Sequence, residues 1–301
     1  MTEPLHGGYA ESELTTVLEE ACRTAGLDST GARLLRGHTN AVVQLTTAPV
    51  VIKIARKGTA PTGVQRTVAC VRWLMDQHFA TVPLHPGIDQ PAIIDDHPVT
   101  FWTHLPQTST TPITAADLAT PLAALHRLPK PPVPLREMDN LGAIHRSLTA
   151  IDTLDPGDLD FLTQHAHHLE RRLETVDYTL PTGVIQGDPQ HRNALRDREG
   201  RTVLCDWDTI AHGRPEWDLV TIEIHCRRFG HGRTHYADFA AGYGFDVTDW
   251  PGYPVLRDIR ELRMITTNAR KAHHTPGSLS EVQRRIKGLR QEEDDLAWNI
   301  L

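Results

Sequence analysis

The stretch from residue 183 to residue 208 constrains this chain more than any other part of the sequence. It places Asp188 after a short apolar run, Asn193 five positions later, and Asp206 at the end of a second apolar run. Magnesium prefers hard oxygen ligands, and a hydroxyl that accepts a phosphoryl group needs a carboxylate to orient it. An aspartate, an asparagine and a second aspartate in this order therefore indicate a site for a divalent metal and for phosphoryl transfer.

Short β-branched segments flank these side chains at residues 184–185 and 202–205, and residues 197–200 between them form a turn signal. The pattern predicts a hairpin-like connection. Asp188 and Asn193 would lie on the loop that leaves the first strand, and the second aspartate would lie at the exit of the next strand. The alternative is a surface hairpin in which Asp and Asn only form turns.

These residues resemble the catalytic segment of the aminoglycoside phosphotransferase and choline kinase-like family, within the protein kinase-like fold. That family has a Gly-Asp-x-x-x-x-Asn loop, a strand that ends in Asp-Trp, and a downstream Gly-x-Pro-x-x-Asp-Leu motif. This sequence carries the three motifs at residues 187–193, 206–207 and 213–219. The resemblance extends from about residue 30 to about residue 270.

The resemblance implies an α+β, bilobal protein kinase-like fold. Residues 1–104 would form a small N-terminal lobe with an antiparallel sheet and one main helix. Residues 105–301 would form a larger, mostly helical lobe that holds the catalytic loop, the metal site and the acceptor-binding helices. The residue pattern predicts strands within 34–35, 41–45, 50–54, 91–94 and 99–102. It predicts helices at about 11–25, 63–77, 115–128, 156–176, 218–228, 235–242, 255–272 and 279–296.

The resemblance also implies a role for each site residue. Asp188 would orient the acceptor hydroxyl or accept its proton, and Asn193 and Asp206 would hold Mg²⁺ against the nucleotide phosphates. Lys53 would contact the α- and β-phosphates, whereas the alternative is an edge-strand lysine that discourages aggregation. The turn over the phosphates would consist of Gly37, His38, Thr39 and Asn40.

The chain departs from the family pattern at two positions. Kinase-like enzymes usually pair the phosphate-binding lysine with a glutamate on the small-lobe helix, but here Thr67 stands at the expected place. Gln65, or a carboxylate from elsewhere, would then have to orient Lys53. Gln186 replaces the more common histidine before Gly-Asp, and its side chain is still able to form a hydrogen bond.

The sequence leaves two further aspartates open. Asp208 either assists the metal or substrate or lies at the surface. Asp218 resembles the family position that braces the catalytic loop, and its alternative role is to cap a helix.

The predicted activity is the Mg²⁺-dependent transfer of the γ-phosphoryl group of ATP or GTP to a hydroxyl group of a small molecule. The acceptor would be an aminoglycoside-like antibiotic or a small metabolite. The alternative is a nucleotide-binding, pseudokinase-like regulator, which the missing glutamate motivates. The intact set of Asp188, Asn193 and Asp206 favours an enzyme. The sequence names neither the acceptor nor the nucleotide.

Composition argues against several other classes of protein. The formal net charge of −7, without a basic stripe, argues against nucleic-acid binding. No apolar run approaches the ~18 residues needed to cross a bilayer, and the N-terminus lacks the pattern of a signal peptide. The four cysteines lie far apart without paired spacing, which is typical of reduced thiols. We therefore expect a cytoplasmic protein, with its oligomeric state left open.

Two further features are predicted to carry no site. His165, His167 and His168 lie on a predicted helix, and in a chain with 18 histidines such groups arise by chance. No carboxylate-plus-cysteine set lies nearby to complete a zinc site. The acidic run at 292–295 opposes the dipole of the last predicted helix, so we expect that end to fray into a solvated tail.

Overall fold

The computed structural model describes residues 9–37, 39–107, 111–272 and 277–301. Its contacts divide the chain into two compact units. The sheet unit consists of the chain up to residue 112 together with residues 131–135 and 193–208. The helical unit consists of residues 113–130, 136–192 and 209–301. The lobe boundary expected between residues 104 and 105 stays a prediction.

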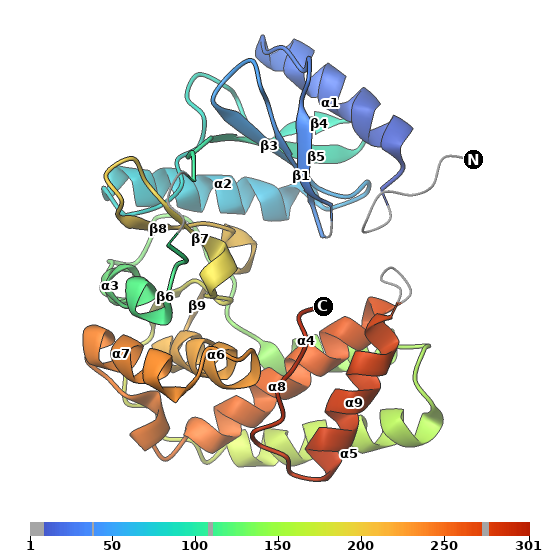
Figure 1. The fold of residues 1–301 in the computed structure, drawn as a ribbon, viewed down its shortest axis with the longest axis vertical. Coiled ribbons are helices and arrows are strands. Elements are labelled where there is room, and N and C mark those ends of the chain that lie inside the picture. The colour runs from blue at the N-terminus through green and yellow to red at the C-terminus, as the bar shows by residue number, and fades with distance from the viewer. Residues whose placement is uncertain (1–8, 38, 108–110, 273–276) are drawn as a thin grey trace. The chain divides into compact units, whose positions relative to one another are not determined.

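In the described part of the sheet unit, an antiparallel sheet has the strand order β1-β2-β3-β5-β4 (Figure 1). Its strands are β1 (Arg33–Gly37), β2 (Ala41–Gln44), β3 (Val50–Ile54), β4 (Ala92–Ile94) and β5 (His97–Thr103). Side chains alternate along β3, so that Ile52 and Ile54 are fully buried on one face. Lys53 therefore projects from the opposite face of the same strand.

Two helices pack onto this sheet, α1 (Glu11–Ala25) and α2 (Pro61–Asp76). The apolar stripe of α1 places Leu14 and Val17 in one core with Ile52 of β3 and Phe101 of β5. This core holds the central strands of the sheet in place and thereby fixes the position of Lys53, which belongs to β3.

A separate hairpin completes the sheet unit. It pairs β7 (Ala194–Arg196) with β8 (Thr202–Leu204) across the predicted turn at 197–200. The apolar run at 184–185 belongs instead to β6 (Gly183–Ile185), which pairs with β9 (Ala211–Gly213) in the helical unit. The turn was predicted correctly, but its first strand was assigned wrongly because Ala194–Arg196 is too short and mixed to show a strand pattern.

The helical unit is built around the packing of α4, α5, α8 and α9 (Figure 1). Its helices are α3 (Ala115–His126), α4 (Asn140–Thr149), α5 (Pro156–Leu173), α6 (Pro215–Arg228), α7 (Arg233–Tyr243), α8 (Tyr253–Arg270) and α9 (Ser278–Arg290). Helix α4 was not predicted. It spans only ten residues, and Asp139 begins it by accepting the backbone N–H of Gly142 at 2.8 Å. Ile144 and Leu148 then bury its inner face.

The end of the chain agrees with the prediction in part. Helix α9 ends at Arg290 rather than at 296, and the acidic residues at 292–295 that follow it are exposed, as expected. Trp298 is 6% exposed within the core of the helical unit. The Asn299 side chain donates to Glu281 of α9 at 2.8 Å. Burial of the tryptophan and this hydrogen bond hold the segment against α9, an effect that helix-dipole reasoning alone did not include.

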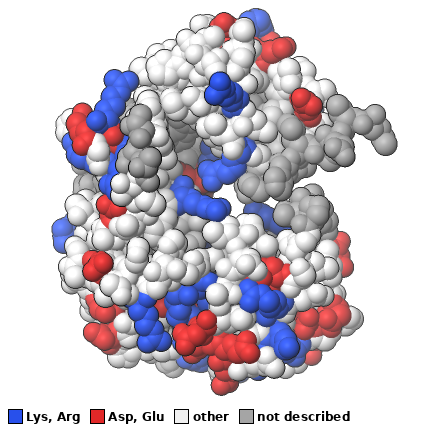
Figure 2. Space-filling model, viewed as in Figure 1, with Lys and Arg blue, Asp and Glu red and all other residues white. Residues whose placement is uncertain are grey.

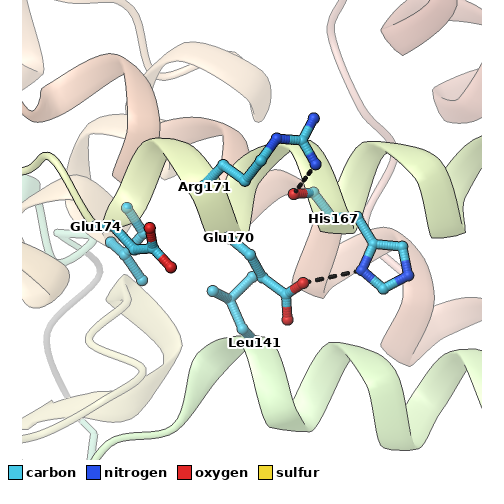
Figure 3. Close-up of a pocket in the computed structure, with 6 residues that line it drawn as sticks. Leu141, His167, Glu170, Arg171 and Glu174 are labelled. Atoms are coloured by element: carbon cyan, nitrogen blue, oxygen red, sulfur yellow. Dashed lines mark hydrogen bonds and ion pairs between the residues drawn. The ribbon is translucent and has the colours of Figure 1, made fainter.

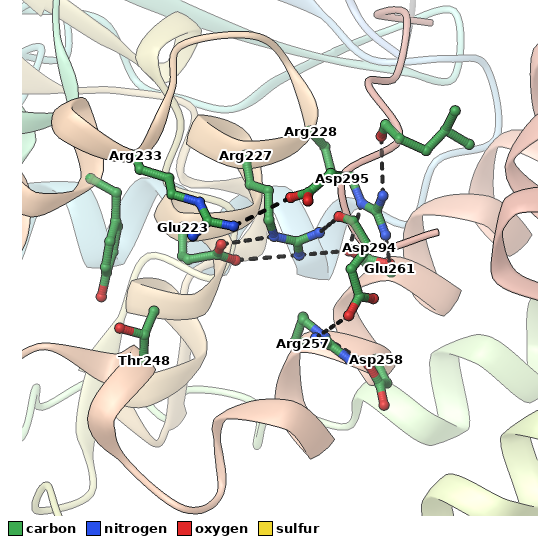
Figure 4. Close-up of polar contacts among 12 residues, drawn as sticks. Glu223, Arg227, Arg228, Arg233, Thr248, Arg257, Asp258, Glu261, Asp294 and Asp295 are labelled. Carbon is green, nitrogen blue, oxygen red and sulfur yellow. Dashed lines mark hydrogen bonds and ion pairs between the residues drawn. The ribbon is translucent and has the colours of Figure 1, made fainter. Parts of the chain in front are cut away.

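A charged network joins this C-terminal segment to α6 and α8 (Figure 4). Glu261 is 2% exposed, and its carboxylate forms ion pairs with Arg227 at 2.8 Å and Arg228 at 2.7 Å. Arg257 forms an outer ion pair with Asp294 at 3.2 Å. The acidic run faces solvent as expected, and Asp294 within it still pairs with α8.

Among the described residues, no helix is both long enough and apolar enough to cross a membrane. The visible face of the helical unit carries acidic and basic side chains close together (Figure 2).

Candidate active site

Lys53 lies at the centre of a cluster of polar side chains in the sheet unit. Its ammonium group donates to Oδ1 of Asp206 and to Oδ2 of Asp208, each at 2.8 Å. Burial tends to lower the pKa of Lys53, but the two carboxylates outweigh burial and raise it. The lysine is therefore charged at neutral pH, and carboxylates from the hairpin segment replace the missing helix glutamate as its partners.

Asp206 follows β8 with a left-handed backbone, at φ 58. Such a conformation is uncommon outside glycine, although aspartate adopts it more readily than most residues. Burial tends to raise the pKa of Asp206, but Lys53 and Arg36 hold it below its usual value. The carboxylate is therefore ionised and directed at the lysine.

The turn between β1 and β2 joins the same cluster. The side-chain amide of Asn40 donates to Oδ2 of Asp208 at 2.9 Å. Gly37 pairs with Ala41 at the end of the strands, and the carbonyl of Thr39 accepts the Tyr9 hydroxyl at 3.3 Å. His38, the remaining predicted residue of this turn, lies outside the described residues. Asp208 thus connects the turn to Lys53.

Asn193 and Asp206 lie at the same end of the β7–β8 hairpin. Ala194 pairs with Leu204, and the backbone N–H of Cys205 donates to the carbonyl of Asn193 at 2.9 Å. Asn193 is 4% exposed. An amide oxygen and an ionised carboxylate form the hard donor set that suits Mg²⁺.

In the helical unit, Asp218 holds the segment that leads to Asp188. Its carboxylate accepts the backbone N–H of Gln186 at 2.8 Å and that of Gly187 at 2.9 Å. His126 of α3 contacts the same carboxylate at 3.1 Å, and Asp218 is 0% exposed. Helix α6 begins after Arg214, so the alternative role of Asp218 as a helix cap is wrong.

Close contacts make glycine necessary at position 187. Gly187 has φ 85, and a Cβ atom there would lie 2.4 Å from the carbonyl oxygen of Thr209. The indole N–H of Trp217 donates to the Gly187 carbonyl at 3.0 Å. The Gln186 side chain accepts the backbone N–H of Asp188 at 2.7 Å, so it does form the hydrogen bond expected of it.

The carboxylate of Asp188 contacts side chains from two parts of the helical unit. Gln190 donates to its Oδ2 at 2.9 Å, and Arg260 of α8 forms an ion pair with its Oδ1. Sequence reasoning missed Arg260, His126 and Trp217. His126 and Arg260 lie on helices far along the chain from the catalytic segment at 183–208. Their only signal in the sequence was a position on the buried face of a helix.

The fold and the two side-chain clusters define a small-molecule kinase with the α+β, protein kinase-like fold. Residues 30–259 match the model of the APH phosphotransferase enzyme family, and the chain belongs to that family. The predicted family, fold class and enzyme class are therefore confirmed. No curated protein matches this sequence.

Solved structures of several kinases are similar to this one. A choline kinase from Streptococcus pneumoniae has a TM-score of 0.70 and 17% identity, over 91% of this chain and 98% of that chain. An amicoumacin kinase bound to AMP-PNP, Ca²⁺ and its antibiotic has a TM-score of 0.72 and 13% identity, over 97% and 96%. A kinase in complex with GDP and kanamycin has a TM-score of 0.61 and 16% identity, over 94% and 98%. At these identities the likeness concerns the fold.

Proposed function

We propose that this protein transfers the γ-phosphoryl group of ATP or GTP to a hydroxyl group of a small molecule, with the aid of Mg²⁺. The observation that carries the proposal is the placement of Lys53 against Asp206 and Asp208, beside the hairpin end that also holds Asn193. A lysine and metal-binding oxygens so arranged are suited to the phosphates of a nucleotide. The AMP-PNP and GDP bound to two similar kinases support the choice of co-substrate.

Asn193 and Asp206 are the proposed metal ligands because their oxygen donors lie at one end of one hairpin. The bound ion would neutralise charge that develops on the transferred group. Asp188 would orient the acceptor hydroxyl, with its own carboxylate positioned by Gln190 and Arg260.

One observation favours a second candidate function. Thr67 occupies the place of the helix glutamate, and its hydroxyl donates to the carbonyl of Gly63 at 3.3 Å within α2. A protein without that glutamate would be a nucleotide-binding regulator if Asp206 and Asp208 failed to position Lys53 for catalysis.

The two candidates differ in turnover. We would measure the melting temperature with Mg-ATP and Mg-GTP, and then γ-phosphate transfer to choline, kanamycin and other hydroxylated compounds. A nucleotide at 100 times its Kd stabilises a protein by about 2.7 kcal/mol. Asp206→Asn should lose this stabilisation, and Asp95→Asn, which alters an exposed ion pair with Lys57 in the same unit, should keep it. Stabilisation without transfer would favour the regulator, and no stabilisation by either nucleotide would refute both functions.

A further inference from the structure

Two arginines of α8 lie beside Trp217 in the helical unit. Arg260 and Arg263 are three residues apart, so they share one face of the helix. Their guanidinium carbons lie 5.5 and 5.7 Å from the centroid of the tryptophan ring. Arg260 is 6% exposed and is bound to the carboxylate of Asp188. The pair therefore stands next to the residue that we propose orients the acceptor.

Arg263 differs from Arg260 in its partners. Its guanidinium donates to the amide oxygen of Asn140 and to the sulfur of Met138, at 3.5 Å for the latter. Both partners are neutral. In the part of the chain that the structure describes, no carboxylate forms an ion pair with Arg263. A half-buried guanidinium without a counter-ion is unfavourable unless an anion binds to it.

The charges around Arg263 are mainly positive. Burial lowers the pKa of Arg263 to about 10, and the charges of Arg260, Arg136 and Arg146 act in the same direction. Asp188 acts against them. The group is still protonated at neutral pH, so this part of the helical unit offers a positive field to a ligand.

We propose that Arg263, supported by Arg260, binds an anionic group on the acceptor. The acceptor would then carry a carboxylate or a phosphate in addition to the hydroxyl that Asp188 orients, a statement that rests on the proposed function. The planar guanidinium matches both anions, because it forms two parallel hydrogen bonds to their oxygens. A polycationic aminoglycoside would meet like charge at the same place.

A matched series on a three-carbon scaffold tests this proposal. The series is glycerol, D-glycerate, glycerol 3-phosphate and 3-amino-1,2-propanediol, which share hydroxyls and differ in charge. We expect one of the two anions to bind the full-length protein with a Kd about tenfold or more below that of glycerol, because a charge-assisted hydrogen bond contributes about 1.5–3 kcal/mol. Comparison of glycerate with glycerol 3-phosphate distinguishes a carboxylate from a phosphate.

Variants assign the preference to the arginine. Arg263→Gln should remove the preference for the anion over glycerol. Arg263→Lys keeps the charge and should bind the anion more weakly than the unaltered protein does. Arg270→Gln, at an exposed arginine near the end of the same helix, should leave it unchanged. Equal binding of glycerol and both anions, tighter binding of the amine, or no binding of either anion would overturn the proposal.

The series is measured without nucleotide, so its result is independent of the phosphoryl-transfer proposal. The melting temperature with Mg-ATP is recorded on the same preparation. Anion preference without nucleotide binding would refute the proposed function alone, and nucleotide binding without anion preference would refute the anionic subsite alone.

A second cluster, separate from the first, lies on α4 and α5. His145 of α4 approaches Glu170 of α5, with Nε2 of the imidazole 2.7 Å from Oε1 of the carboxylate. His167, one turn before Glu170, lies with Nδ1 2.9 Å from Oε2 (Figure 3). The three possible ligand atoms all lie within 4.8 Å of one another.

We infer that His145, His167 and Glu170 bind a divalent transition metal such as Zn²⁺. Two imidazoles and a carboxylate form a known zinc ligand set that leaves the fourth position open. His167 and Glu170 of this cluster also line a pocket, together with Leu141 and Glu174 among others (Figure 3). The sequence predicted no zinc site at His167, because no carboxylate-plus-cysteine set lies nearby and His145 belongs to another helix.

Calorimetry with Zn²⁺ on the chelator-treated protein tests this site. We expect saturable binding of one ion and a rise in melting temperature, because the ion would join α4 to α5. His145→Ala and Glu170→Gln should each abolish both effects. His168→Ala, at an exposed histidine on the same helix, should abolish neither. The inference fails if His145→Ala binds zinc as the unaltered protein does, or if neither protein binds it.

Discussion

The carboxylate of Asp218 accepts the backbone N–H of Gly187 at 2.9 Å, although 31 residues separate the two along the chain. The same carboxylate accepts the N–H of Gln186 at 2.8 Å. Both donors lie immediately before Asp188. The start of α6 therefore determines where the segment that leads to the proposed catalytic aspartate can lie.

Asp218→Ala should destabilise the protein by about 3 kcal/mol, because two buried N–H groups lose their acceptor. It should also lower turnover more than it raises the KM for the acceptor. Chemical denaturation and steady-state kinetics measure the two effects. Asp238→Ala, at an exposed aspartate on α7, is the control and should change neither. Full activity in Asp218→Ala would contradict the bracing role.

Asp188→Asn should lower turnover about 100-fold or more while nucleotide binding is retained, because the acceptor hydroxyl loses its carboxylate. It should also destabilise the protein by about 2 kcal/mol, since Arg260 is left buried without its ion pair. Arg260→Gln in the same chain should restore part of that stability. A double-mutant cycle of unfolding free energies measures the coupling. Strict additivity of the two changes would show that the ion pair contributes nothing.

Lys53→Met should weaken Mg-nucleotide binding about 10- to 100-fold, the effect of losing a charge-assisted hydrogen bond to phosphate. Isothermal calorimetry measures the Kd. Lys57→Met is the matched control, because Lys57 pairs with Asp95 at the surface of the same unit. An unchanged nucleotide Kd in Lys53→Met would support the alternative of a lysine that only protects the sheet.

Gly187→Ala should destabilise the protein strongly and reduce activity, because the new Cβ would lie 2.4 Å from a backbone carbonyl. Gly230→Ala controls for backbone strain alone. Gly230 has φ 76 and nothing within 4 Å of an added Cβ. The difference in unfolding free energy between the two variants isolates the steric clash, and equal destabilisation would show that the clash relaxes without cost.

The stability of the C-terminal segment should fall in acid. Burial tends to raise the pKa of Glu281, but Arg284, Arg285 and Asn299 lower it to about 2, from 4.5 in the unfolded chain. A carboxyl group with a depressed folded pKa contributes stability that is present above pH 4.5 and is lost as the pH falls through 2. Glu281→Gln should therefore destabilise the protein at pH 7 and lose that difference toward pH 2. Thermal melts from pH 7 to pH 2 measure this, with Glu292→Gln at an exposed position as the control.

The sequence predicted most elements of the fold because their burial follows one period. Alternation along residues 50–54 and the apolar stripe of α1 are visible without a structure. Helix α4 was missed because ten residues contain too few repeats to show a period. The burial of Trp298 and the hydrogen bond of Asn299 to α9 were missed because both are long-range contacts, which local propensity does not describe.

The candidate site was predictable to the extent that its residues are close in sequence. Asn193 and Asp206 flank one hairpin, and their proximity follows from the turn between them. Arg260 and Arg263 lie more than 70 positions beyond Asp188, and only the packing of α8 brings them near it. The two arginines of the proposed acceptor subsite are therefore brought to Asp188 by tertiary structure, whereas the proposed metal ligands are brought together by one local hairpin.

The sheet unit is assembled from three separate pieces of chain, and the piece at 193–208 supplies both carboxylates that Lys53 contacts. A single crossover near residue 112 between two related genes would take Lys53 and the β1–β2 turn from one parent. The hairpin at 193–208 would come from the other parent. A functional chimaera would need a second, internal graft of residues 193–208. Natural recombination faces the same requirement. Lys53, the β1–β2 turn and residues 193–208 are therefore expected to be inherited together, although they are separated in the gene.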